Sequence, residues 1–146
     1  MASEARTILL VDDEPDILES MKEYLESMLD GLTVLTASSG KAGLLLMDKN
    51  KVELIITDYK MPEMNGLEFL REAAKKAPTV PRIILTAFPK LELAIQAINE
   101  VEVDRFLTKP IRPEELERLV KTFLEKTAAR RTGGASAFGD MPGKKF

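Results

Sequence analysis

Five residues of the 146-residue sequence carry side chains that could perform chemistry together. The acidic pair Asp12 and Asp13 directly follows an apolar run, and Asp58 follows a second one. Thr86 ends a third apolar run, and Lys109 comes shortly after a fourth. Because the sequence contains no histidine and no cysteine, a Ser–His triad, a thiol nucleophile and a zinc–thiolate site are excluded. Chemistry is left to carboxylate, ammonium and hydroxyl groups.

The elements that position these side chains alternate regularly along the chain. Continuous apolar runs are typical of strands buried on both faces, and the stretches between them have the spacing of amphipathic helices. We predict strands over 7–11, 32–37, 54–57, 82–86 and 105–107. We predict helices from Pro15 to a stop at Gly31, from the cap Ser38 to about Lys49, after Gly66, from Pro89 to about Glu100, and from Pro113 to about Thr127.

This alternation predicts an α/β fold with a doubly wound parallel sheet. Right-handed crossovers favour the flavodoxin-like strand order 2-1-3-4-5 at this chain length. We expect one domain over 1–127 and a flexible tail containing Gly, Ala and Ser over 128–146. The net charge of −3 argues against direct nucleic-acid binding. No apolar run is long enough for a membrane span and the start has no apolar signal region, so we expect a cytoplasmic protein.

The predicted strand order brings three carboxylates to one edge of the sheet. The first and third strands are neighbours, so Asp12, Asp13 and Asp58 converge at their carboxyl ends. Two carboxylates about 4 Å apart repel by roughly 4 kcal/mol at an effective dielectric constant near 20, which favours a bound cation. Hard oxygen ligands without histidine or cysteine favour Mg²⁺ or Ca²⁺, and Mg²⁺ suits a few carboxylates plus a phosphate. With Lys109 and Thr86 nearby, these residues predict phosphoryl transfer to an aspartate.

Four segments in order resemble the receiver domain of two-component response regulators. They are residues 8–15 (ILLVDDEP), 58–66 (DYKMPEMNG), 84–87 (ILTA) and 106–110 (FLTKP), each at a predicted strand end. The resemblance extends from about Arg6 to Lys126.

The resemblance implies a role for each residue of the predicted site. Asp58 would be the phosphoacceptor and would form an acyl phosphate. Asp12 and Asp13 would hold Mg²⁺ together with Asp58 and the backbone carbonyl of Lys60. Lys109 would pair with the phosphoryl group, and its bond to the following proline would be cis.

The resemblance also implies a switch and a control of phosphoryl lifetime. Thr86 would move to bond a phosphoryl oxygen, and Phe106 would rotate into the vacated space, although Phe106 fits a purely structural core position equally well. Lys60 and Phe88 would flank the path of the attacking water. Because Phe88 is bulky and apolar, we expect slow autodephosphorylation.

As a receiver, the chain is expected to act as a signalling switch and not as an enzyme, beyond phosphorylating itself from a donor and slowly losing the group. A histidine kinase or phosphotransfer protein must be the donor, since the chain has no histidine. The output face would comprise the fourth helix, fifth strand and fifth helix, and would control a partner or a domain outside this sequence, or form a homodimer. Two alternatives are a Mg²⁺-dependent aspartyl-nucleophile hydrolase of haloacid dehalogenase type and a phosphate-independent adaptor.

The fourth predicted helix has more apolar residues than one buried face requires. These residues are Leu91, Leu93, Ala94, Ile98 and Val101. The pattern is compatible with a docking face and equally with a helix buried beneath a loop.

Overall fold

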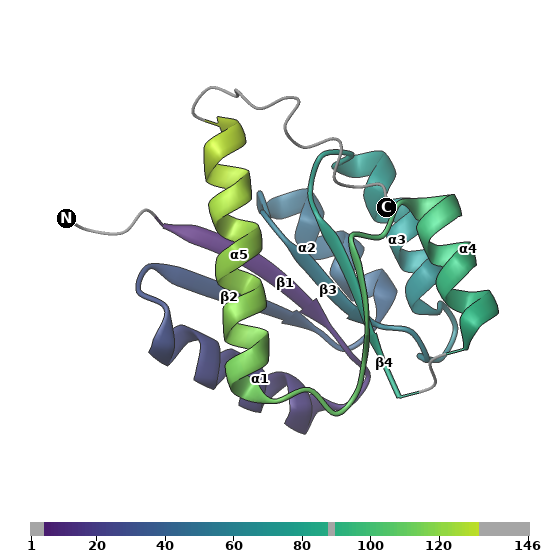
Figure 1. Cartoon of the computed structure of the whole chain (residues 1–146), viewed down its shortest axis with the longest axis horizontal. Helices are drawn as coiled ribbons and strands as arrows, with labels where there is room; N and C mark the ends of the chain where they lie inside the picture. Colours follow the sequence, from purple (N-terminus) through teal and green to yellow (C-terminus); the bar gives the residue numbers. More distant parts are fainter. Residues whose placement is uncertain (1–4, 88–89, 132–146) are drawn as a thin grey trace.

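The computed structural model describes residues 5–87 and 90–131, in which five strands alternate with five helices (Figure 1). The strands are β1 (Arg6–Val11), β2 (Leu32–Ala37), β3 (Ile55–Asp58), β4 (Arg82–Thr86) and β5 (Arg105–Thr108). The helices are α1 (Pro15–Met28), α2 (Gly40–Lys49), α3 (Gly66–Lys76), α4 (Leu91–Val101) and α5 (Pro113–Arg131).

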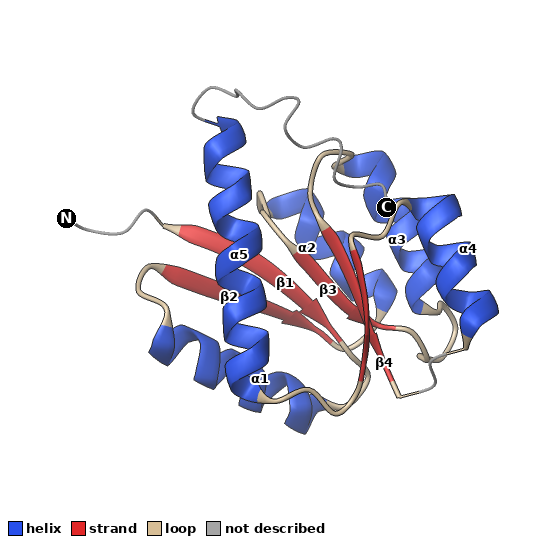
Figure 2. Cartoon of the chain, in the orientation of Figure 1, coloured by secondary structure: helices blue, strands red, loops and turns tan. Residues whose placement is uncertain are grey.

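The strands form one parallel sheet in the order β2-β1-β3-β4-β5, which confirms the flavodoxin-like prediction. Helices α1 and α5 cover one face of the sheet, and α2, α3 and α4 cover the other (Figure 2). Asp58 lies opposite Leu85 in the register of β3 and β4, and Thr86 lies opposite Thr108 in that of β4 and β5. The sheet therefore brings the predicted site residues to one edge.

Alternating side chains of the strands build a separate core on each face. Ile8 and Leu10 of β1 are buried beneath α1 and α5, whereas Leu9 and Val11 are buried beneath α2 and α3. Burial on both faces explains why the strands have continuous apolar sequences instead of alternating ones. In the part of the chain that the structure describes, we find no helix with both the length and the apolar character needed to cross a bilayer.

Two helix boundaries that we predicted in the amino-terminal half of the chain are wrong by a few residues. Helix α1 ends at Met28, before the predicted stop at Gly31, because Leu29 adopts extended backbone and Gly31 takes a positive φ of 81° in the following turn. Helix α2 is capped by Ser39 and not by Ser38, since the Ser39 side chain accepts a hydrogen bond from the Ala42 N–H at 3.1 Å.

The carboxyl-terminal helix is longer than predicted. Helix α5 continues to Arg131, four residues past the predicted end at Thr127, so the first residues of the predicted tail are helical. The added residues are two alanines and two arginines. Alanine has a high helix propensity, and a positive charge near the carboxyl end of a helix interacts favourably with the helix dipole. Residues 132–146 and the predicted helix start at Pro89 lie outside the described residues; α4 is described from Leu91.

Candidate functional site

Three carboxylates converge at the carboxyl edge of the sheet, as predicted. Asp12 and Asp13 directly follow β1, and Asp58 is the last residue of β3. One carboxylate oxygen from each lies within 4.8 Å of the others. We refer to these three residues as the acidic cluster. Asp12 is buried, Asp58 is mostly buried and Asp13 is exposed, so the cluster faces solvent on one side only.

Lys109 supplies the positive charge beside the acidic cluster. Its Nζ lies 2.7 Å from Asp12 Oδ2 and 3.4 Å from Asp58 Oδ2. The Lys109 N–H donates to the Thr86 carbonyl at 2.8 Å, which holds the start of the β5–α5 loop against β4. The Lys109–Pro110 peptide bond is cis, as the resemblance implied. The lysine therefore bridges two carboxylates that come from different strands.

The electrostatics of Asp58 and Lys109 reflect this arrangement. Burial raises the pKa of the Asp58 carboxyl, and the Asp12 charge adds to this effect, whereas the Lys109 charge and the Tyr59 N–H oppose it; the net direction is upward. Burial lowers the pKa of Lys109, but its hydrogen bond to Asp12 and the charges of Asp12 and Asp58 outweigh that effect and raise it. Lys109 is thus held as a cation.

Local backbone contacts fix the carboxylates in place. The Glu14 N–H donates to Asp12 Oδ1 at 2.9 Å, and the Tyr59 N–H donates to Asp58 Oδ1 at 2.8 Å. The loop after Asp58 folds back so closely that a Cβ at Gly66 would collide with the Asp58 carbonyl. The Gly66 N–H also donates to the Tyr59 carbonyl at 2.7 Å. Glycine is required at 66 by this close approach.

Of the remaining predicted site residues, the structure describes Thr86, Phe106 and Lys60. Thr86 is fully buried at the end of β4. Phe106, on β5, is partly buried and packs against the core beneath α2, α3 and α4. Lys60 is exposed in the loop that follows Asp58. Phe88 lies outside the described residues.

The acidic cluster has the donor chemistry of a magnesium site. Carboxylate oxygens are hard ligands, and Mg²⁺ is bound in proteins by one or two carboxylates together with water and phosphate oxygens. Two of the three carboxylates are largely withdrawn from water, where unneutralised like charges are costly. Lys109 offsets part of this charge. Three carboxylates against one lysine leave a net negative charge, so the residues present fit Mg²⁺.

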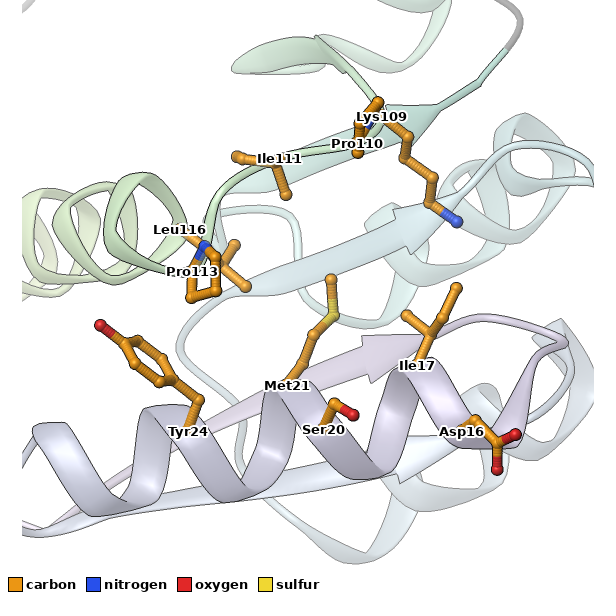
Figure 3. A pocket seen from close by; sticks show the side chains of 10 residues that line it. All are labelled: Asp16, Ile17, Ser20, Met21, Tyr24, Lys109, Pro110, Ile111, Pro113 and Leu116. Atoms are coloured by element: carbon orange, nitrogen blue, oxygen red, sulfur yellow. The ribbon is translucent and has the colours of Figure 1, made fainter.

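A pocket of about 420 Å³ that the sequence interpretation missed adjoins the acidic cluster through Lys109 (Figure 3). Its lining is mostly apolar and comes from α1, from the loop that leads into α5 and from the start of α5. The lining residues are Asp16, Ile17, Ser20, Met21, Tyr24, Lys109, Pro110, Ile111, Pro113 and Leu116. The apolar residues Ile17 and Ile111 are visible in the sequence, but only the packing of their two segments against each other creates the pocket.

Comparison with known proteins identifies relatives over most of the chain. The family model of the response regulator receiver domain matches residues 8–121. The chain is 38% identical over 128 residues to the transcriptional regulatory protein GlrR of Escherichia coli K12, covering 88% of this chain but only 28% of GlrR. It is 36% identical to an uncharacterized 14.6 kDa protein of Leptolyngbya boryana, covering 80% of this chain and 88% of that protein. The crystal structure of a CheY-like receiver domain from Methanospirillum hungatei JF-1 superimposes with a TM-score of 0.80 at 31% identity, covering 88% of this chain and 99% of that one.

Proposed function

The chain belongs to the family of response regulator receiver domains, which are phosphorylation-activated signalling switches, and from this premise we propose that Asp58 is its phosphoacceptor. The observation that carries this assignment is the position of Asp58 in the acidic cluster: its carboxylate faces Lys109 at 3.4 Å while Tyr59 holds its other oxygen. Its neighbour Asp12 is paired with Lys109 at 2.7 Å, and we assign Asp12 and Asp13 to the metal because their carboxylates converge on that of Asp58. The family match does not support the haloacid dehalogenase alternative.

The proposed reaction moves a phosphoryl group from a phosphohistidine to Asp58. A carboxylate oxygen of Asp58 attacks phosphorus, the P–N bond breaks, and the histidine nitrogen leaves with the electron pair of that bond. Lys109 holds its ammonium group where negative charge accumulates on the phosphoryl oxygens. Mg²⁺, held by Asp12, Asp13, Asp58 and the Lys60 carbonyl, would supply further charge neutralisation.

We propose that Thr86 and Phe106 transmit the effect of phosphorylation at Asp58 to the rest of the domain. Thr86 ends β4 beside Asp58, and its hydroxyl is the group that would bond a phosphoryl oxygen. Phe106 lies opposite Ile84 in the register of β4 and β5, two residues from Thr86, and its partial burial is compatible with a change of rotamer. As phenylalanine it can change its burial but cannot donate a hydrogen bond.

The lifetime of the phosphoryl group is proposed to depend on Lys60 and Phe88. We expect the bulk of Phe88 to hinder water attack on the aspartyl phosphate and to make autodephosphorylation slow. Phe88→Ala should accelerate phosphate loss, followed by intact mass against time after donor removal. An unchanged rate would contradict this role.

The output surface is proposed to be the face of α4, β5 and α5, acting on a partner protein, an attached domain or a second copy of the chain. Ile95 and Ile98 on α4 are 49% and 53% exposed, which supports contact with another protein. The chain spans only 28% of the length of GlrR, so the whole-length activities of such relatives do not transfer to it directly.

Receiver domains of response regulators are phosphorylated by histidine kinases, and we propose that the pocket beside Lys109 receives the donor protein. Its apolar lining on α1 lies next to the phosphoacceptor site, where a protein carrying a phosphohistidine must bind. Ser20→Arg would fill the pocket. It should slow transfer from a phosphorylated histidine phosphotransfer domain and leave transfer from acetyl phosphate unchanged; equal slowing of both would contradict this docking site.

Intact mass after incubation with Mg²⁺ and acetyl phosphate tests the proposed function. We expect one phosphoryl group on the unmodified chain, persisting for minutes or longer, and none on Asp58→Asn. Continuous phosphate release without a persisting adduct would indicate a hydrolase instead. Mg²⁺ binding without any adduct would support the phosphate-independent adaptor.

A further inference from the structure

Asn65 and Gly66 form the one Asn-Gly pair of the sequence, and they lie where the loop after Asp58 enters α3. In such a pair, the backbone nitrogen of the glycine can attack the side-chain carbonyl carbon of the asparagine. Glycine favours this attack because it has no side chain to crowd its nitrogen.

The reaction of an Asn-Gly pair needs no reactant other than water. As the new C–N bond forms, the bond to the amide nitrogen breaks, and ammonia leaves with that electron pair and with the proton of the glycine N–H. A five-membered succinimide ring remains. Water opens the ring at the side-chain carbonyl to give aspartate, or at the backbone carbonyl to give isoaspartate, in which the main chain runs through the side chain.

The folded backbone of Asn65 holds the reacting atoms out of position. A five-membered ring is nearly planar, so its closure requires the Gly66 nitrogen to eclipse the Cβ of Asn65. Asn65 has φ −77° and ψ 172°, which keeps this nitrogen staggered relative to Cβ. The ψ angle of Asn65 must therefore rotate before the ring can close.

Gly66 blocks that rotation while the loop is closed. Its N–H donates to the Tyr59 carbonyl at 2.7 Å, and a rotation at Asn65 would turn this N–H away. Gly66 is also buried, and a Cβ on it would collide with the Asp58 carbonyl and lie 2.9 Å from Tyr59 Cα. Ring closure therefore requires the loop between Asp58 and Gly66 to open.

A capping box holds the side chain of Asn65 at the start of α3. The Glu68 N–H donates to Asn65 Oδ1 at 2.8 Å, and the Asn65 N–H donates to Glu68 Oε1 at 2.9 Å. Both bonds lie at the surface, where water can replace them. The side chain that would react is thus fixed by bonds that a single substitution can remove.

The same loop contains a strained turn. The Met64 N–H donates to the Pro62 carbonyl at 2.7 Å, and Glu63 between them has a positive φ of 69°. A three-residue turn with positive φ is unfavourable for a residue other than glycine. Because strain opposes the few bonds that close the loop, we expect the loop to open locally more often than the sheet does.

We propose that Asn65 is a latent deamidation site, which reacts with Gly66 only when the loop after Asp58 opens and which disables the phosphoacceptor site when isoaspartate forms. The gating is a property of the unphosphorylated fold. The consequence rests on the proposed function. Isoaspartate adds a methylene to the main chain where Gly66 has no spare room, whereas aspartate keeps the chain length and can still cap α3.

Deamidation of the full chain in native buffer and in urea tests the gating. Peptide mapping by mass spectrometry measures aspartate and isoaspartate at position 65 against time, and separates them from isoaspartate at Asp30-Gly31, which can form the same ring. We expect the native chain to react at least about tenfold more slowly than the unfolded chain, because the reaction waits for local opening. Equal rates in the two conditions would overturn the gating.

Glu68→Ala, which removes one bond of the capping box, tests which contacts keep the site closed. We expect deamidation at 65 to become about fivefold faster in native buffer and to stay unchanged in urea. Glu68→Gln keeps an acceptor and should restore the slow rate, and Glu72→Ala on the same helix is the matched control. An unchanged native rate, or equally faster hydrogen exchange of all amides, would overturn the local gate.

The isoaspartate form tests the consequence for the phosphoacceptor. A chain aged in urea and refolded is separated into its unmodified, aspartate and isoaspartate forms, and each is incubated with Mg²⁺ and acetyl phosphate. We expect the aspartate form and Asn65→Asp to be phosphorylated at the unmodified rate, and the isoaspartate form about a hundredfold more slowly, because it misplaces the reacting carboxylate.

Each outcome of this comparison separates the two proposals. Phosphorylation of the isoaspartate form at the unmodified rate would overturn the consequence, and so would loss of its whole fold by circular dichroism, since the effect would then not be local to the loop. If the unmodified form accepts no phosphoryl group, the proposed function fails, while the gating is still decided by the deamidation rates.

Discussion

The surroundings of Asp58 disfavour the charged form of its carboxyl group. Burial and the neighbouring Asp12 raise its pKa, so the folded protein prefers the protonated form more than the unfolded chain does. We predict that Asp58→Asn, measured without Mg²⁺, melts higher than the unmodified chain at neutral pH, by roughly 2–4 °C. As the pH falls through the raised pKa, the unmodified chain takes up its proton and the difference should shrink.

Thermal unfolding followed by circular dichroism between pH 4 and 8 measures this prediction. Asp13→Asn is the matched control, because Asp13 belongs to the same acidic cluster but is exposed, and its effect should be smaller. A lower melting temperature for Asp58→Asn at neutral pH would contradict the prediction.

Lys109 is the ammonium group placed against both Asp12 and Asp58. We predict that Lys109→Met slows phosphorylation by acetyl phosphate by about 10²-fold at saturating Mg²⁺, the usual effect of removing one donor to a reacting oxyanion. Rates are measured by intact mass. Lys41→Met, which removes an exposed lysine of α2, should leave the rate unchanged. A rate for Lys109→Met equal to that of this control would remove Lys109 from the reaction.

At the scale of elements, β2 is an edge strand whose outer side is covered by an ion pair from α1. The Val34 N–H donates to Glu26 Oε2 at 2.8 Å, and Lys22 Nζ donates to the Val34 carbonyl at 2.9 Å and to the same Glu26 oxygen. Burial raises the pKa of Glu26, but the hydrogen bonds from Lys22 and Val34 lower it by more. This pair satisfies backbone groups that an edge strand otherwise exposes.

We predict that Glu26→Ala lowers the free energy of unfolding by about 1 kcal/mol at neutral pH. Because the folded pKa of Glu26 is lowered, its contribution is present above the ordinary glutamate pKa of about 4.3 and is lost as the pH falls through the folded value. Urea unfolding at pH 7 and pH 3 measures both effects. Glu72→Ala, from the exposed Glu72–Lys75 pair of α3, is the control and should change little.

The end of α4 contains a strained residue. Glu102 adopts φ 51°, a conformation that costs non-glycine residues about 1–2 kcal/mol, part of which glycine recovers. We predict that Glu102→Gly raises the free energy of unfolding by roughly 0.5–1 kcal/mol in urea. Gln96→Gly in the same helix should lower it, since glycine weakens a helix interior. Destabilisation by both would contradict the prediction.

At the scale of the whole molecule, large exposed apolar side chains lie on α1, α2 and α4, and of these helices only α4 belongs to the proposed output face. Ile98 lies on α4 of the proposed output face, and Leu45, 59% exposed, lies on α2. We predict that phosphorylation promotes dimerisation and that Ile98→Glu prevents it, while Leu45→Glu does not. Sedimentation velocity with and without Mg²⁺ and acetyl phosphate measures the dimer. An effect of Leu45→Glu alone would place the interface on another face.

The sequence by itself determined the order of the elements, the parallel sheet and the meeting of Asp12, Asp13 and Asp58. Continuous apolar runs mark strands buried on both faces, and the carboxyl ends of parallel strands share one edge. The same reasoning placed Thr86 and Lys109 at that edge. These conclusions needed only local periodicity and the connection rules of α/β folds.

Only the tertiary structure decided which side chains touch across long separations. Lys109 and Asp12 are 97 residues apart, and the side chain of Arg82, read from the sequence only as a strand start, bonds carbonyls about 20 residues away. Side-chain direction also decides that Ser39 and not Ser38 caps α2. It likewise shapes the pocket between α1 and the segment that leads into α5. Periodicity assigns a residue to a face, whereas contacts follow from the packing of all elements at once.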